Sequence, residues 1–293
     1  MIKFLNKIIN KLFKLKKLYK QQNELKILSG LSLLKTKINS ENINDHELKI
    51  FSQFGEDGII DFLVKKIDLK TKTFIEFGVE DYEESNTKFL LEAKNWKGLV
   101  FDSSQTFIDI IKKKDFYWRN NFVAVNAFIT AESINDLIRK NFPHKEVALM
   151  SIDIDGNDYW VWKAIDTCKP AIIIIEYNAR FGYEKSVTVP YKKDFDRILE
   201  HHSSIYFGAS LMALYKLGKE KGYSLVGTNL NGNNSFFIRN DFIKKNQNIK
   251  TFTPEQCFHI NSFNELRDKK GNILDRNNLK EKEILEKLPL EEV

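Results

Sequence analysis

Carboxylate and amide side chains follow directly after two short apolar segments of the sequence, residues 149–152 and 172–175. Both segments have the composition of strands that are buried on both faces in a parallel sheet. Functional groups in open α/β sheets lie beyond the carboxyl ends of the strands, so we expect these polar side chains to meet at one sheet edge. The side chains are Asp153, Asp155, Asp158, Glu176 and Asn178.

Crowded carboxylates repel one another unless some of them bind protons or a cation lies among them. Their hard oxygen atoms suit Mg²⁺ or Mn²⁺. They also suit a reaction of a hydroxyl nucleophile, in which positioning and deprotonation are the main tasks. The alternative is that some of these residues, Asn157 and Asp158 in particular, cap the following helix or bind loop amides.

His201 and His202 are a second candidate for proton transfer, because an imidazole titrates near neutral pH. They end a segment, residues 180–202, that contains Pro190 and little periodicity. Long irregular connections in compact domains often cover a site, so we predict a loop-rich segment there. The histidine pair equally fits a position that faces solvent.

A third group of residues indicates a bound ribose. Glu76 is followed two residues later by Gly78, and glycine lets the backbone approach a ligand closely. Asp102 lies 24 residues beyond Gly78, the spacing at which a nucleotide-binding βαβ unit places its ribose-binding carboxylate. The glycines that a pyrophosphate requires are missing, which disfavours NAD. A cofactor with a ribose and without phosphate remains.

Alternating apolar patterns predict the elements that position these residues. We expect strands at residues 73–81, 96–102, 122–127, 147–153 and 171–177, separated by helices. An Asn-Gly turn at Asn231 predicts a hairpin between residues 223–227 and 235–239. We therefore predict three parts: a basic amphipathic helix with a linker (1–47), a catalytic domain (48–245) and a C-terminal tail (246–293).

The net charge of +6 belongs to the first 20 residues, which hold seven lysines and no acid. The other 273 residues carry 39 basic and 40 acidic groups, so no nucleic-acid partner is expected. Apolar residues between the lysines predict an amphipathic helix, which can lie on an anionic membrane or pack against a partner, including a second copy. Cys168 and Cys257 form no CxxC pair, which fits a reducing, cytoplasmic location, with the helix at the inner membrane face.

Seven short segments carry a family resemblance: residues 52–57, 74–80, 84–87, 151–160, 175–178, 206–211 and 221–223. They are similar to segments of FkbM-like and related sugar O-methyltransferases, a group within the class I S-adenosylmethionine-dependent enzymes. The resemblance covers about residues 50–240, and the two acidic strand ends are its most specific parts. It implies an α/β fold, a Rossmann-like class I methyltransferase sheet of parallel strands with a C-terminal antiparallel hairpin.

The resemblance also implies roles for individual residues. Glu76 and Gly78 would border the methionine moiety of S-adenosylmethionine, and Asp102 would hold the ribose hydroxyls. Glu80 stands where many class I enzymes have a second glycine, which puts the pose of the cofactor in doubt. The remaining expected cofactor residues are Gln53 and Asn86 at the amino-acid end, Asn126, Ala127 and Phe128 at the adenine, and Asp153 at the border with the acceptor.

Some antibiotic-sugar methyltransferases of similar fold hold a divalent ion at these two strand ends. By that resemblance Asp155, Glu176 and Asn178 would be the ligands of Mg²⁺ or Mn²⁺. Asp155 would also be catalytic, with His201 or His202 as the base. The expected acceptor is a sugar hydroxyl of a nucleotide-linked or surface-polysaccharide sugar, such as a heptose.

Two other functions stay open at this point. Asp153 and Asp155 also form an Asp-x-Asp pair, which predicts a metal-dependent glycosyltransferase that holds a sugar nucleotide through Mn²⁺. That hypothesis leaves Gly78 and Asp102 without a role. A catalytically silent scaffold that docks partners through the N-terminal helix is the third possibility, and only that helix supports it.

Overall fold

The computed structural model describes residues 2–36, 39–142, 144, 146–245, 248–275 and 279–293. Its contacts divide the chain into two compact units, residues 1–39 and 40–293. The second unit contains the sheet and every residue of the site. The three-part division expected from the sequence stays a prediction.

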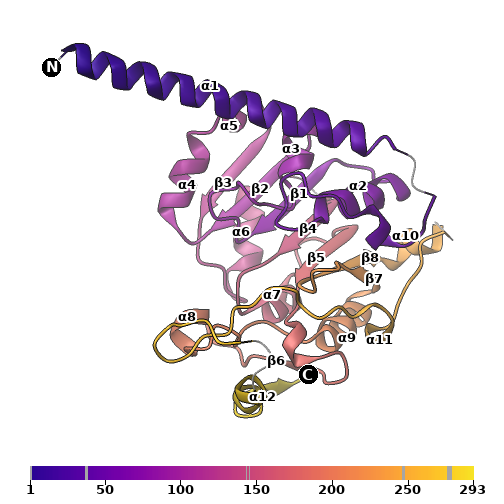
Figure 1. Ribbon diagram of the computed structural model, residues 1–293. Coiled ribbons are helices and arrows are strands. Elements are labelled where there is room, and N and C mark those ends of the chain that lie inside the picture. Colours follow the sequence, from indigo (N-terminus) through magenta and orange to yellow (C-terminus); the bar gives the residue numbers. More distant parts are fainter. Residues whose placement is uncertain (1, 37–38, 143, 145, 246–247, 276–278) are drawn as a thin grey trace. The chain divides into compact units, whose positions relative to one another are not determined.

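A seven-stranded sheet forms the centre of the second unit, with the strand order β3-β2-β1-β4-β5-β8-β7 (Figure 1). The first five strands in this order are parallel, and β8 is antiparallel to both β5 and β7. This is the Rossmann-like class I methyltransferase sheet, so the predicted fold class is confirmed. The strands are β1 Thr73–Phe77, β2 Lys97–Asp102, β3 Phe122–Asn126, β4 Leu149–Ile152, β5 Ile172–Glu176, β7 Tyr223–Thr228 and β8 Asn234–Arg239.

Helices cover both faces of the sheet, because the fully buried strands present apolar side chains to each face. One core layer packs the sheet against α2 Glu56–Lys66, α3 Lys88–Lys94, α4 Gln105–Lys112, α5 Asp115–Arg119 and α10 Asn240–Lys245. The other packs it against α6 Ile134–Asn141, α7 Asp158–Ala164, α9 Leu211–Lys221 and α11 Pro254–Cys257.

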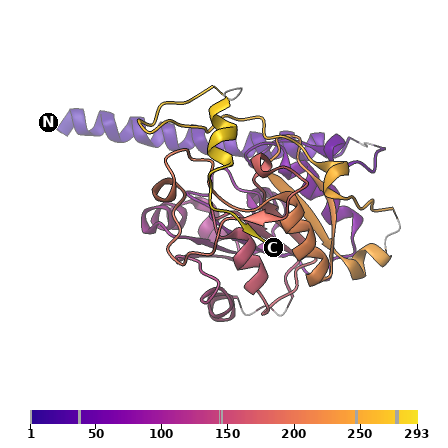
Figure 2. The same cartoon turned by 90° about the horizontal axis from the view of Figure 1, so that it is seen from below.

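Short elements fill the connections near the carboxyl edge. They are η1 Ile43–His46, η2 Ala179–Phe181, β6 Val187–Thr188, α8 Arg197–Glu200, α12 Leu279–Leu285 and β9 Glu291–Glu292. The final strand β9 pairs with β6 in antiparallel fashion, so the C-terminus of the chain is tied to the 180–202 segment (Figure 2).

The first unit is the helix α1, Ile2–Leu33, which continues well past the helix expected from the lysine-rich pattern. Phe4, Phe13 and Leu18 on this helix are more than half exposed. None of the helices in the described ranges is both long and apolar enough to cross a membrane. Binding to a membrane surface stays a prediction.

Gly78 brings the ends of β1 and β4 into close approach. Its φ is +70°, and a Cβ atom at this position would lie 1.7 Å from the carbonyl oxygen of Asp153. Only glycine combines this backbone conformation with this contact. The cofactor side and the acidic side of the sheet edge therefore meet at one glycine.

Substitution of Gly78 by alanine is expected to lower the free energy of unfolding by about 3 kcal/mol or more, because the new methyl group collides with backbone. Gly222→Ala is the matched control. Gly222 also has positive φ, +84°, but no atom lies within 4 Å of its Cβ position, so about 1 kcal/mol is expected. Urea denaturation measures both, and equal losses would contradict the proposed close approach.

Candidate functional site

A pocket of about 590 Å³ opens at the carboxyl edge of the sheet. The ends of β1 to β5 and the start of β8 line it, together with α8 and residues of the C-terminal tail. Most of the residues expected from the sequence lie in this lining. They are Gln53, Glu76, Gly78, Asn86, Asp102, Ala127, Phe128, Asp153, Asp155 and Glu176.

Glu76 organises the loop that follows β1. Its carboxylate accepts hydrogen bonds from the Ser85 and Thr87 hydroxyls, each at 2.5 Å, and from the backbone N–H of Asn86 at 2.9 Å. Burial raises the pKa of Glu76, and these hydrogen bonds oppose the shift. The Asn86 side chain, held in this way, donates to the hydroxyl of Ser151 on β4. Glu76 thus shapes the wall of the pocket.

Asp102 is held at the end of β2 by backbone amides. The Glu80 N–H donates to one carboxylate oxygen at 2.8 Å, and the Ser104 N–H donates to the other at 2.7 Å. The carboxylate keeps a lone pair for a ligand hydroxyl. Asn126 differs from the expectation, because it is absent from the lining and its amide donates to the carbonyl groups of Asp102 and Ser103. Asn126 therefore braces the loop, and Ala127 and Phe128 face the pocket.

Three carboxylates converge at the ends of β4 and β5. Asp153, Asp155 and Glu176 each place an oxygen within 4.8 Å of the others. Burial, and then the charge of neighbouring carboxylates, raises the pKa of Asp153 and of Glu176 well above the ordinary value. The Oε2 atom of Glu176 is buried without a hydrogen-bond partner. The cluster therefore needs protons or a cation.

Asn178, expected to be a metal ligand, is not available for that role. Its amide N–H groups donate to the carbonyl oxygens of Ile205 and Phe207, and its Oδ1 accepts from the backbone N–H of Arg180. The residue lies outside the pocket lining and fixes the chain after β5. Asp153 takes the place of Asn178 in the cluster.

Asp158 binds loop amides, so the structure favours the alternative interpretation of this residue. Its carboxylate accepts from the N–H groups of Ile154 and Gly156 at 2.8 and 2.9 Å. These bonds close the loop in which Asp155 has a φ of +55°, an uncommon conformation for a residue other than glycine. Backbone strain of this kind is often found at functional sites.

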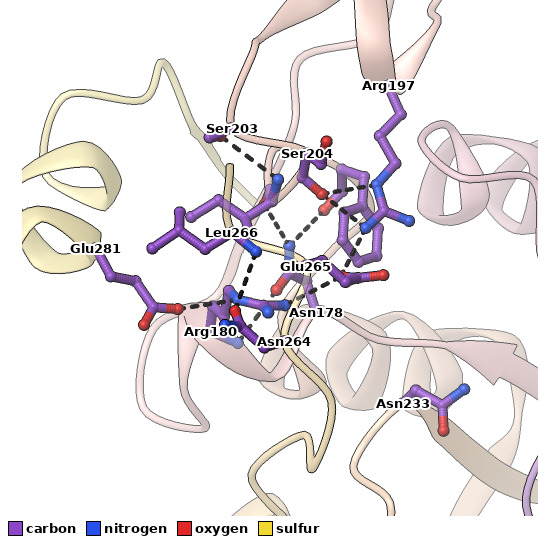
Figure 3. A network of polar contacts seen from close by, with 12 residues as sticks. Asn178, Arg180, Arg197, Ser203, Ser204, Asn233, Asn264, Glu265, Leu266 and Glu281 are labelled. Atoms are coloured by element: carbon purple, nitrogen blue, oxygen red, sulfur yellow. Dashed lines mark hydrogen bonds and ion pairs between the residues drawn. The ribbon is translucent and has the colours of Figure 1, made fainter. Parts of the chain in front are cut away.

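Arg197 on α8 connects Asp155 of the acidic cluster to the C-terminal tail, and Figure 3 shows its contact with Glu265 of the tail. Its guanidinium group lies 2.7 Å from Asp155 Oδ1 and 2.7 Å from Glu265 Oε2. Arg180 pairs with Glu265 as well and with Glu281. In Figure 3 both guanidinium groups turn toward Glu265. This network holds the tail over the pocket.

His201 and His202 are not among the described residues that line the pocket. The rings of the two histidines pack on each other, with centroids 4.3 Å apart. The Nδ1 atom of His201 is hydrogen-bonded to the hydroxyl of Ser203. The structure therefore does not bring the expected base to the carboxylates.

Several lining residues were not expected from the sequence. Phe54 and Phe263 stack across the pocket, with ring centroids 5.7 Å apart. Phe263 and Glu265 belong to the tail, where no periodicity marks them. Asn234 follows an asparagine-rich turn. A hairpin turn requires fewer asparagines than this segment has, and that excess is the sequence feature that could have indicated a site residue here.

Comparisons with known proteins give the following. No family model matches the chain, and no curated protein sequence matches it significantly. Similar solved structures include an O-methyltransferase from Bacillus cereus in complex with SAH, 15% identical, covering 57% of this chain and 72% of that chain with a TM-score of 0.36. A second is an S-adenosylmethionine-dependent methyltransferase from Clostridium acetobutylicum, 12% identical, covering 63% and 90% with a TM-score of 0.39. The class of this fold follows from the strand order of the sheet, independently of these similarities.

Asp57 fixes the segment that presents Gln53 to the pocket. Its buried carboxylate accepts from the N–H groups of Ile50, Phe51 and Ser52 at 2.7 to 2.8 Å. Burial raises the pKa of Asp57 from 3.8 to about 6, although these bonds lower it. The protonated form is therefore favoured more in the folded chain than in the unfolded chain.

This shift predicts a pH dependence of stability. A carboxyl group whose pKa is raised on folding contributes most below about pH 4, and the contribution is lost as the pH rises through about 6. Over that window the free energy of unfolding of the wild type should fall by about 3 kcal/mol relative to Asp57→Asn, which cannot titrate. Denaturant titrations between pH 4 and pH 7 measure the difference. A constant difference would contradict the assignment.

Proposed function

We propose that this protein is an S-adenosylmethionine-dependent O-methyltransferase that acts on a sugar hydroxyl. The proposal is supported by the division of the pocket at the carboxyl edge of a class I sheet. The ends of β1, β2 and β3 provide Gly78, Asp102 and Phe128 on one side, where a ribose and an adenine fit. The ends of β4 and β5 provide the carboxylate cluster on the other side.

The charge of the lining is the observation that carries the proposal. Eight acidic residues line the pocket, and Arg197 is the single basic residue among the described lining residues. Such a field favours a cationic ligand, and S-adenosylmethionine carries a sulfonium and an ammonium group. It opposes a diphosphate that enters without a cation, and the glycosyltransferase hypothesis also leaves Gly78 and Asp102 without a role. By the same reasoning a neutral polysaccharide sugar is a better acceptor than a sugar linked to a nucleotide diphosphate.

A divalent cation fits the acidic cluster. Asp153, Asp155 and Glu176 offer hard oxygen atoms at mutual distances within 4.8 Å, and the buried Oε2 atom of Glu176 lacks a partner. These three residues would hold Mg²⁺ or Mn²⁺. A bound divalent cation lowers the pKa of a coordinated hydroxyl group.

The protein's own groups then account for the transfer. Arg197 binds one lone pair of Asp155 Oδ1, the second lone pair of that oxygen can face the cation, and Oδ2 remains for the acceptor hydroxyl. The hydroxyl oxygen attacks the methyl carbon as the bond from that carbon to sulfur breaks, and Asp155 takes the hydroxyl proton. Phe54 and Phe263 stack on each other in the lining and present apolar surface to the reactants. Fixing the two reactants in line supplies much of the rate enhancement.

Two substitutions should separate the halves of the pocket. Asp155→Asn should retain affinity for S-adenosylhomocysteine and lose about 100-fold in turnover, because the proton acceptor and one cation ligand are removed. Asp102→Asn should lower the affinity for S-adenosylhomocysteine about tenfold, because a charged hydrogen bond to the ribose is lost. Calorimetry and a methyl-transfer assay measure these effects. An Asp155→Asn variant that turns over normally would overturn the catalytic assignment.

A further inference from the structure

Buried acceptor atoms without partners gather around the acidic cluster. They are Oε2 of Glu176, Oδ1 of Asn234 and Oδ1 of Asn157, and all three residues line the pocket. Glu176 and Asn234 are directly paired in the register of β5 and β8. Their side chains are 7% and 4% exposed, so water does not readily satisfy them. A buried acceptor left unpaired is destabilising, because it has lost its hydrogen bonds to water and gained none in the protein.

The orientation of the Asn234 amide is set by its other neighbour. Asn234 Nδ2 donates to Oε1 of Glu56 at 3.0 Å, and Asn229 Nδ2 donates to the same oxygen at 2.8 Å. The other Glu56 oxygen accepts from the N–H groups of Phe54 and Gly55. A carboxylate that receives four donors acts as an acceptor only, so the Asn234 amide cannot exchange its nitrogen and oxygen. Its Oδ1 must remain an acceptor.

The one guanidinium group of the described lining is already committed to other acceptors. The guanidinium group of Arg197, the single basic group of the described lining, contacts Asp155, Glu265 and the carbonyl oxygen of Ser204. The acceptor atoms of Glu176 and Asn234 are therefore satisfied either by a proton within the cluster or by a bound cation. Three carboxylates and one amide oxygen form a hard-oxygen set, which a divalent cation prefers over other ligands.

We propose that Asn234 Oδ1 is a fourth protein ligand of the divalent cation held by Asp153, Asp155 and Glu176. This inference rests on the proposed function, in which that cation assists the reaction. The sequence had indicated Asn178, just beyond the end of β5, as the amide ligand. The proposal assigns that role to Asn234 on the neighbouring antiparallel strand β8. An amide suits this position because an aspartate would place another carboxylate against Glu56.

The test is a titration of the full-length protein with Mn²⁺ in the absence of substrate. Calorimetry measures the bound Mn²⁺, and electron paramagnetic resonance measures the free Mn²⁺. Asn234→Leu keeps the volume and removes the oxygen, so the affinity for Mn²⁺ should fall at least about tenfold. The double variant Asn234→Asp with Glu56→Gln exchanges the two functional groups. It should bind Mn²⁺ at least as tightly as the wild type.

The double variant is designed to preserve the fold. The glutamine amide introduced at position 56 can donate to the new carboxylate at position 234 and still accept from the Phe54 and Gly55 N–H groups. Asn229 keeps its bond to the side-chain oxygen of Asn233, at 2.7 Å. Unchanged affinity for S-adenosylhomocysteine and an unchanged melting temperature are the controls for each variant.

The outcomes separate the inference from the proposed function. If Asn234→Leu binds Mn²⁺ as the wild type does, while Asp155→Asn does not, the role of Asn234 is overturned and the cation site stands. If the wild type does not bind Mn²⁺, the cation and this inference are both overturned. Methyl transfer that is insensitive to chelators would then still support the methyltransferase.

Discussion

The repulsion between carboxylates at adjacent strand ends is the constraint on which the site depends. Asp153, Asp155 and Glu176 are forced together because parallel strands β4 and β5 end side by side. Desolvation of Asp153 and Glu176, beside the charge of Asp155, makes their negative charges unfavourable. Arg197 compensates part of this charge and, through Glu265, recruits the C-terminal tail to the pocket. The rest of the compensation falls to protons or to a bound cation.

Acidic residues in the other parts of the edge are stabilised differently. Glu76, Asp102 and Asp158 each accept hydrogen bonds from nearby backbone amides and so hold the loops that follow β1, β2 and β4. Glu76 and Asp158 shape the pocket in this way, Asp102 does so and also keeps a lone pair for a ligand, and the β4 and β5 cluster keeps acceptor oxygens free. The presence of loop N–H donors thus decides the role of a carboxylate at this edge. A carboxylate with such donors holds a loop, and one without them keeps its oxygen atoms available for a ligand.

The sheet could be predicted because its strands are apolar runs that end in polar residues, and their carboxyl ends must share an edge. Asp155 and Glu176 follow from that rule alone. The orientation of Asn178 does not follow from it. Whether this amide faces the site or the following loop depends on the carbonyl groups of Ile205 and Phe207, about 30 residues away. Asn234 and Glu265 come from an antiparallel strand and a tail, whose placement depends on tertiary contacts that local patterns do not encode.

The central claim is that the acidic half of the pocket activates a sugar hydroxyl for methyl transfer. The most direct measurement is transfer of a labelled methyl group from S-adenosylmethionine to neutral oligosaccharides and nucleotide-sugars, before and after chelation and after addition of Mn²⁺. The account predicts transfer to a sugar, loss of transfer on chelation and recovery with Mn²⁺. Transfer to no sugar in the panel would contradict the central claim, and transfer to a sugar that chelation leaves unchanged would contradict the role of the cation in it.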